Sequence, residues 1–287
     1  MNISLPLPPI LKGVKTVVGL HITDKVIRLL EVDKNGKPVI EPIELKLEGK
    51  DKETALREII SEYKLSSKRV VTCVPVNDGL LKLYKYPKSM SKKDLQNAIE
   101  WSIKREISAM KEETYYDYFL LDEASEEKQI GVITVISRKE TVENIRKLIE
   151  SVGLKLHILD YEIIAIINYG LYYKFPVPFS ILYIDYNYSI LVTYSRTNIS
   201  YYVNYWNYSE FRESGNEESL ENFFAEMRNI VVLNDLSSMY VAGPIIADED
   251  MLTRIMENLP ILGLLDLEGV KPSFFIPYIL CIRGMEG

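Results

Sequence analysis

The sequence predicts an α/β protein of two lobes, and three observations support this class. Two segments rich in β-forming residues, 16–32 and 180–195, each break around a short polar turn, which is typical of hairpins. Each hairpin is followed by alternating helix-like and strand-like patterns. The chain has 287 residues, 47% of them hydrophobic and 26% charged, a composition typical of a folded globular protein. We therefore expect two lobes, each beginning with a hairpin.

After the first hairpin, the hydrophobic pattern alternates between strand and helix as far as residue 172. The helices carry apolar residues three and four positions apart, whereas the strands are short apolar or alternating runs. The elements expected there are a strand within 32–45, a helix at 52–63, a strand at 69–75, a helix over 90–107, strands at 115–123 and 130–138, a helix at 139–152, and a strand and helix within 155–172. The segment 76–138 has the order strand, helix, strand, strand.

Capping residues mark two helix ends. Ser91 and Asp94 form a pattern similar to a capping box, and Gly153 stands where a left-handed residue ends the next helix. Trp101 falls almost opposite the apolar stripe of its helix. Because a half-buried Trp is commoner than a binding Trp, we expect Trp101 to make a second internal contact.

The second half begins after Pro176 and Pro178, which punctuate the chain. A turn at 196–198 leads from the second hairpin into a further strand. Eight tyrosines between 183 and 208 indicate a sheet face with polar tips rather than a base-stacking platform. Later elements are a helix reaching about residue 233, a strand at 238–243, a helix at 248–258 and an apolar ending at 273–282.

Composition excludes several classes of function. The formal net charge of -7 lacks the basic excess that nucleic-acid binding requires. Cys73 and Cys281 are isolated, so we expect neither a disulfide framework nor a zinc site, and a reducing compartment fits. No window resembles a signal peptide or a membrane span, so we expect no direct membrane span. With only His21 and His157, histidine-based catalysis has few candidates.

Two hairpin-headed halves indicate the duplicated lobes of an actin-like, ribonuclease H-like fold. Particular strings make this more specific. The run MSKKDLQNAIEWSIKREI (90–107) resembles the "MS-x-x-E-L-x-x-A-I-x-W-E" helix of the FtsA-related type IV pilus assembly protein PilM family, with Ser102 where that family often has Glu. Similar strings are RVVTCVP (69–75), SRKETVENIRKLIESVGLKLHILDYEIIAI (137–166), GLHITDKVIRLLEV (19–32) and CIRG (281–284). The chain thus resembles a shortened, divergent member of this family over nearly its whole length.

The resemblance implies an actin-like body with a small strand-helix-strand-strand subdomain inserted in the first lobe. The boundaries that we expect are an N-terminal tail at 1–15, a first lobe at 16–75 and 156–178, the insert at 76–155, and a second lobe at 179–287. Only a short polar stretch separates the second-lobe hairpins from the next helix, so we expect a reduced second lobe without its extra helical subdomain.

The same resemblance implies a cytoplasmic adaptor that is peripheral at the inner membrane through a partner. Such proteins bind the cytoplasmic N-terminal peptide of PilN in a groove between the insert and the first lobe. We expect the partner-binding residues to include Val74, Pro75, Trp101 and Arg105, and we consider a homo-oligomer possible. Ile3-Ser4-Leu5-Pro6 resembles the Ile-Asn-Leu-Leu-Pro type of peptide that PilM proteins bind, so the tail is either a mobile end or a segment that docks in its own groove or a neighbour's.

The resemblance also places a nucleotide site between the two hairpin turns, and here the motifs are altered. The corresponding residues are Gly19, Thr23, Lys25, Asp185, Asn187, Ser189 and Gly243. His21 and Thr23 replace an Asp and a Gly of the first turn, Asn187 replaces a Gly of the second, and Pro244 follows Gly243. We expect a vestigial site without enzymatic activity, at which ATP and Mg²⁺ binding stays possible.

Two other classes stay open, namely an actin-like ATPase that polymerises and the cytoplasmic half of a type II secretion platform protein. In the first, Asp185 would organise Mg²⁺ and Lys25 would contact phosphate. His21 is a phosphate-facing cation, a metal ligand or a hydrogen-bonded turn residue, and we favour the last. We expect no metal site, because the chain has a single other histidine.

Overall fold

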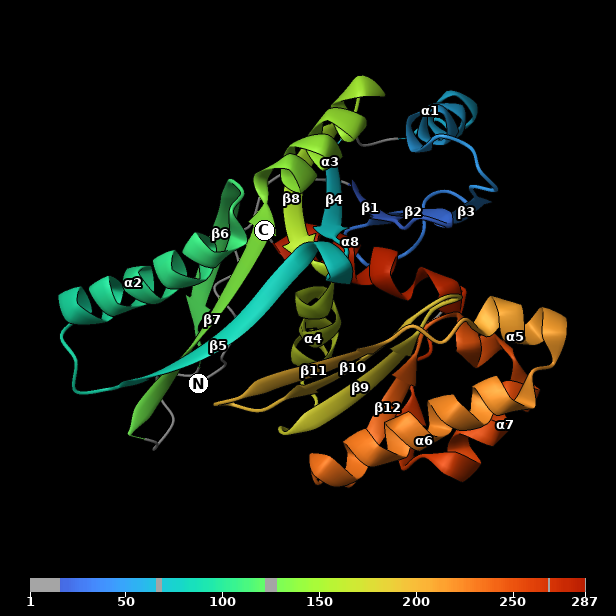
Figure 1. Ribbon diagram of the computed structural model, residues 1–287. Coiled ribbons are helices and arrows are strands. Elements are labelled where there is room, and N and C mark those ends of the chain that lie inside the picture. Colours follow the sequence, from blue (N-terminus) through green and yellow to red (C-terminus); the bar gives the residue numbers. More distant parts are fainter. Residues whose placement is uncertain (1–15, 66–68, 122–127, 268, 287) are drawn as a thin grey trace.

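The computed structural model describes residues 16–65, 69–121, 128–267 and 269–286, and it has the two-lobed α/β fold expected from the sequence (Figure 1). The strands are β1 (Thr16–Ile22), β2 (Val26–Asp33), β3 (Ile43–Lys46), β4 (Arg69–Val74), β5 (Gly79–Pro87), β6 (Thr114–Leu120), β7 (Gln129–Arg138), β8 (Lys155–Tyr161), β9 (Phe179–Ile184), β10 (Ser189–Tyr194), β11 (Ile199–Asn204), β12 (Met239–Ala242) and β13 (Ile261–Leu264). The helices are α1 (Lys52–Glu62), α2 (Lys92–Met110), α3 (Lys139–Ser151), α4 (Glu162–Tyr172), α5 (Tyr208–Ser214), α6 (Glu217–Leu233), α7 (Glu249–Asn258) and α8 (Phe275–Glu286).

The two large sheets have the same topology. The first has the order β3-β2-β1-β4-β8, and the second has the order β11-β10-β9-β12-β13. In each, three antiparallel strands are extended by two strands that run parallel to the first strand of the hairpin. The hairpin-led halves of the sequence therefore form duplicated lobes.

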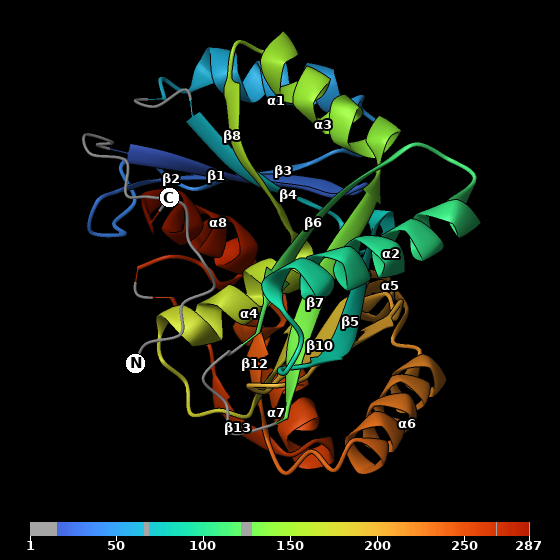
Figure 2. The same ribbon diagram turned by 90° about the vertical axis from the view of Figure 1, so that its left-hand side faces the viewer.

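Helices α4 and α8 lie between the two large sheets (Figures 1 and 2). One buried apolar cluster runs from Val71 of the first sheet, through Ile166 of α4 and Ile279 of α8, to Ile190 of the second sheet. The predicted second lobe (179–287) includes α8, but this helix packs on β1, β2 and β4 of the first sheet. An apolar C-terminal helix can bury two faces at once between the sheets, which explains this position.

The outer faces of the large sheets are covered by further helices. Helices α1 and α3 cover the first sheet, whereas α6 and α7 pack on the second. Ile149 of α3 is buried with Leu56 of α1 and Val18 of β1. The part of the predicted 76–155 insert that packs as a separate layer is therefore 79–138, because α3 belongs to the core of the first sheet.

The separate layer consists of the sheet β5-β7-β6 and helix α2. Val132 of β7 packs against Ile99 and Ile103 of α2, while the adjacent Ile133 points the other way, into the main core. Ser91 caps α2 as expected, because its hydroxyl oxygen accepts a hydrogen bond from the Asp94 backbone N–H at 3.2 Å. The second internal contact expected of Trp101 is wrong, since this side chain is 63% exposed. Helix α2 covers one side of a small sheet, so its opposite face meets solvent.

Two further expectations concern local features. Gly153 follows α3 with a φ of 81°, so the left-handed helix stop is confirmed. The N-terminal tail, with Ile3-Ser4-Leu5-Pro6, lies outside the described residues. Among the helices that the structure describes, none has both the length and the apolar character needed to cross a bilayer.

Candidate functional site

A groove separates the three-stranded sheet from the first large sheet. It has a volume of about 430 Å³, and its lining is predominantly apolar. One wall comes from β6 and β7, and the other comes from β8 with parts of α3 and α4. The lining residues are Val74, Tyr115, Tyr116, Asp117, Tyr118, Phe119, Val135, Ser137, Val142, Ile158, Leu159, Asp160, Tyr161, Ile164, Asn168 and Arg283.

Both walls of the groove include the edge strand of a sheet. β6 pairs only with β7, and β8 pairs only with β4, among the strands that the structure describes. An edge strand presents unpaired backbone N–H and C=O groups to whatever lies beside it. The groove therefore offers backbone hydrogen bonds from two sides and apolar contacts from its walls.

Three polar side chains in the groove lining lie close together. Arg283 of α8 approaches Asp160 with its Nε 3.9 Å from Oδ2, and the Asn168 amide donates to the same oxygen at 3.4 Å. Burial raises the pKa of the Asp160 carboxyl, although the Tyr161 backbone N–H and Arg283 oppose that rise. The Arg283 Nη1 is buried and has no hydrogen-bond partner among the described residues.

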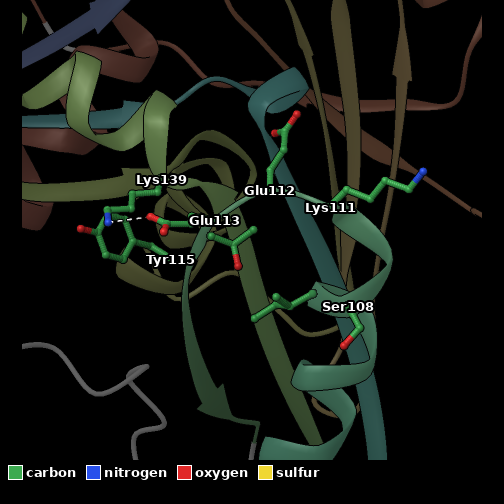
Figure 3. A pocket seen from close by; sticks show the side chains of 8 residues that line it. Ser108, Lys111, Glu112, Glu113, Tyr115 and Lys139 are labelled. Carbon is green, nitrogen blue, oxygen red and sulfur yellow. Dashed lines mark hydrogen bonds and ion pairs between the residues drawn. The ribbon is translucent and has the colours of Figure 1, made fainter.

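A second hollow adjoins the groove and shares Tyr115 with it. It lies where α2 ends and β6 and α3 begin, and Figure 3 shows its charged side chains. Lys139 points toward Glu113, and their charged atoms are 2.7 Å apart. Because these charges are paired and open to solvent, the hollow resembles a charged rim of the groove rather than a site of its own.

Between the lobes, Arg28 lies where the resemblance places a nucleotide. It extends from β2 and is completely buried. Its Nη1 and Nη2 atoms donate to the two carboxylate oxygens of Asp185, both at 2.7 Å, and its Nε donates to Glu44 at 2.6 Å. The guanidinium carbon lies 5.0 Å from the ring centroid of Tyr186. A bidentate buried ion pair therefore joins the two lobes.

Asp185 is also held by its own lobe. The Tyr183 hydroxyl and the Tyr186 backbone N–H donate to its oxygens at 2.8 and 2.7 Å. Burial by itself raises the pKa of the Asp185 carboxyl, but Arg28, with smaller effects from His21 and Tyr183, lowers this pKa to about 2. The carboxylate is thus ionised and neutralised by protein donors.

His21 and Glu162 extend this buried network. The Nε2 of His21 lies 3.3 Å from a Glu162 carboxylate oxygen, and its Nδ1 lies 3.4 Å from the Arg28 Nη1. Glu162 also accepts hydrogen bonds from the Tyr188 hydroxyl and, at 2.9 Å, from the Val76 backbone N–H. The interpretation of His21 as a turn residue is wrong, because His21 lies within β1 and is buried.

The predicted cofactor-binding glycines are approached by the protein itself. A Cβ atom at Gly19 would lie 2.0 Å from the carbonyl oxygen of Pro277 in α8, and one at Gly243 would lie 2.5 Å from the carbonyl oxygen of Ile184. Gly243 also has a φ of 98°, which favours glycine. Both glycines therefore serve close packing between elements.

The other predicted cofactor-binding residues lie in or beside the two turns. The Thr23 hydroxyl oxygen accepts the backbone N–H of Val26 at 3.0 Å, which closes the first turn. Lys25 is exposed beside it, and Asn187 is half-buried in the second turn. Ser189 is buried, and its hydroxyl has no partner among the described residues.

The structure brings only part of the predicted partner-binding set to the groove. Val74 lines it, and Pro75 follows at the end of β4. Trp101 and Arg105 lie together on α2, with the guanidinium carbon 5.2 Å from the ring centroid, and neither lines the groove.

Sequence reasoning missed Arg28, Glu162 and Arg283 as site residues. Each interrupts an apolar run, in VIRLLEV, YEIIAII and CIRG respectively. A charged residue inside such a run is the available signal, because burying a charge requires a partner. No group of three or more His, Cys, Asp or Glu side chains that would hold a metal ion occurs within 16–65, 69–121, 128–267 and 269–286.

Comparisons with known proteins agree on family and fold. The family model of the type IV pilus assembly protein PilM matches residues 41–175, which include both walls of the groove except Arg283. No curated protein matches the sequence. Among solved structures, the chain is similar to a chain of the PilM–PilN type IV pilus biogenesis complex, with a TM-score of 0.76 and 16% identity over 96% of this chain and 99% of that one.

Two further solved structures share the fold at lower similarity. One is a protein of Bacteroides thetaiotaomicron described as having an actin-like ATPase fold, with a TM-score of 0.53, 8% identity and coverage of 93% of this chain and 95% of that one. The other is the cytoplasmic domain of EpsL, an inner-membrane component of the Vibrio cholerae type II secretion system, with a TM-score of 0.52, 14% identity and 95% of each chain covered. The actin-like fold expected from the sequence is confirmed, and residues 41–175 match the model of the type IV pilus assembly protein PilM family.

Proposed function

We propose that this chain is a cytoplasmic adaptor of a type IV pilus or related secretion platform. It binds the N-terminal peptide of an inner-membrane partner similar to PilN, and it does not hydrolyse ATP. The observation that carries the proposal is the apolar groove between the edge strands β6 and β8. The PilM family match over both walls and the similarity to a PilM–PilN complex support it.

An extended peptide suits this groove for physical reasons. It gains main-chain hydrogen bonds from an edge strand and places alternate side chains into pockets. Val135, Phe119 and Ile158 supply apolar contacts along the walls. The unpaired backbone groups of the edge strands β6 and β8 supply hydrogen-bond partners for such a peptide.

The proposal of no ATP hydrolysis rests on Asp185. A carboxylate that organises metal-bound water must face the metal, whereas both oxygens of Asp185 accept hydrogen bonds from Arg28. A metal ion could bind Asp185 only after displacing the guanidinium, which would leave a buried charge without its partner. The altered phosphate turns offer too few contacts to a metal-bound nucleotide to offset that cost.

The test is binding of a synthetic peptide containing Ile-Asn-Leu-Leu-Pro to the full chain, measured by calorimetry. Val142→Glu places a charge on a half-buried groove position, and we expect it to weaken binding at least tenfold. Val232→Glu is the matched control, because Val232 is 78% exposed on α6 and does not line the groove. Equal loss with both variants, or no binding by the wild-type chain, would remove the proposal.

A further inference from the structure

The two walls of the groove are joined by a short junction at residues 75–79. Here the chain leaves β4 of the first sheet and enters β5 of the three-stranded sheet through a single 3₁₀ turn at Val76–Asp78 (Figure 1). The chain crosses back between β7 and α3, and there Ser137 and Arg138 donate to the Asp78 carbonyl and carboxylate oxygens at 2.8 and 3.0 Å. The two crossings are thus tied together, and the junction sets the angle between the walls.

The first lobe holds this junction with two consecutive residues. The Tyr161 hydroxyl lies 3.0 Å from the carbonyl oxygens of both Val76 and Gly79. A Cβ atom at Gly79 would lie 2.4 Å from the Tyr161 ring, so the junction packs directly on that ring. The Glu162 carboxylate accepts the Val76 backbone N–H at 2.9 Å. Tyr161 therefore contributes both to the groove lining and to the hold on the junction.

The second lobe reaches the same junction twice, although it contributes nothing to the groove lining. Tyr188, at the turn before β10, donates to Glu162 and so supports the carboxylate that holds Val76. Tyr205, directly after β11, donates to the side-chain oxygen of Asn77. Two hydroxyl groups of the second lobe are thus linked to the junction between the groove walls.

We propose that the second lobe positions the peptide groove through the contacts Tyr188–Glu162–Val76 and Tyr205–Asn77. This inference rests on the proposed function, since it assigns Tyr188 and Tyr205 as positioning residues for peptide binding. If the junction is already ordered, the two groove walls keep a fixed angle before the peptide arrives. Peptide binding then costs no conformational entropy for ordering the junction, so affinity is higher. The second lobe, which does not line the groove, then takes part in recognition.

The primary test is Tyr205→Phe in the full chain, with the Ile-Asn-Leu-Leu-Pro peptide as the probe. Tyr205 is 63% exposed, so the variant folds, and it removes one hydroxyl group. We expect peptide affinity to fall about three- to tenfold, as the loss of one hydrogen bond predicts. Tyr202→Phe is the matched control, because Tyr202 also lies in the second lobe and donates to Glu226 at 2.9 Å, away from the junction.

Hydrogen exchange at the Val76 amide provides a readout that a merely structural role would not move. We expect faster exchange in Tyr205→Phe and Tyr188→Phe, but not in Tyr202→Phe at equal thermal stability. Glu162→Gln, which keeps an acceptor for Val76 and a partner for Tyr188, should retain slow exchange and most of the affinity.

The outcomes separate this inference from the proposed function. If the wild-type chain binds the peptide and both tyrosine variants match it in affinity and exchange, the inference is overturned and the adaptor function stands. If the wild-type chain binds no peptide, the proposed function fails. Faster exchange in Tyr205→Phe and Tyr188→Phe alone would then still uphold control of the junction by the second lobe.

Discussion

At the residue scale, the Arg28–Asp185 pair has the largest energetic consequence. Both side chains are buried, and each is the main counterion of the other. A buried pair adds little over an apolar replacement, but removing one partner leaves an uncompensated charge. The pair is therefore weak evidence for high stability, but replacing either residue alone should destabilise the fold.

We expect Arg28→Met to lower the free energy of unfolding by about 3–5 kcal/mol, because Asp185 is left charged and buried. The double variant Arg28→Met/Asp185→Leu should recover much of that loss. Arg146→Met is the control, since Arg146 is exposed and, among the described residues, pairs with Glu143 on α3, and its loss should cost less than about 1 kcal/mol. Urea denaturation measures all three, and a full, unrecovered loss in the double variant would contradict the argument.

Acid should lower the free energy of unfolding, because it protonates the Asp185 carboxylate. The pKa of Asp185 is lowered from an ordinary value of 3.8 to about 2, so folding favours its ionised form. Its contribution is complete above about pH 4 and is lost as pH falls toward 2. The stability advantage of the wild-type chain over Asp185→Asn should therefore shrink by about 2–3 kcal/mol between about pH 6 and about pH 2.

Chemical denaturation across this pH range measures the difference. Asp24→Asn serves as the control, because the Asp24 side chain is 89% exposed and its ion pair with Lys52 lies at the surface. If the difference in unfolding free energy between the wild-type chain and Asp185→Asn stayed constant down to pH 2, the Asp185 carboxyl would have the same pKa in the folded and unfolded states.

At the scale of elements, α2 illustrates how one helix can serve two environments. Its inner face buries Ile99 and Ile103 against β7, while Trp101 and Arg105 stack in solvent on the outer face. The periodicity predicted the two faces correctly. It did not predict that the second face would stay uncovered, because that depends on which element lies beyond it.

We expect Trp101→Ala to change the free energy of unfolding by less than about 1 kcal/mol, since it removes one exposed ring and its contact with Arg105. Ile103→Ala on the inner face should cost about 2–5 kcal/mol, because it leaves a cavity. Thermal and urea unfolding of the two variants measure the contrast. A loss at Trp101 comparable to that at Ile103 would mean that another surface covers the ring.

At the scale of the whole molecule, the two lobes share one core. The apolar cluster extends from the first sheet through α4 and α8 to the second sheet, and the Arg28–Asp185 ion pair links the two lobes. Neither lobe can move freely without exposing part of this core. The arrangement of the lobes therefore depends on contacts within the protein.

We expect Mg-ATP at about millimolar concentration to leave the melting temperature unchanged relative to MgCl₂ alone. A ligand that binds only the folded state raises the melting temperature by mass action. Here Arg28 engages the carboxylate, and protein carbonyl oxygens approach Gly19 and Gly243. A rise in melting temperature of several degrees that disappears in Asp185→Ala would favour the alternative of an actin-like ATPase.

The sequence by itself determined the features that depend on neighbouring residues. The two hairpins, the cap at Ser91, the helix stop at Gly153 and the strand-helix-strand-strand order all follow from patterns within a few residues. The family strings then predicted the actin-like arrangement and a groove beside the inserted sheet.

Only the tertiary structure decided which distant residues meet. Arg28 and Asp185 are 157 positions apart, and Arg283 reaches the groove because α8 returns to the first sheet. Whether Trp101 is covered and where α8 packs are also decided by layers that form only when the chain folds. Local patterns specify elements through short-range sterics and hydrogen bonds, whereas the pairing of buried charges depends on the packing of whole sheets and helices.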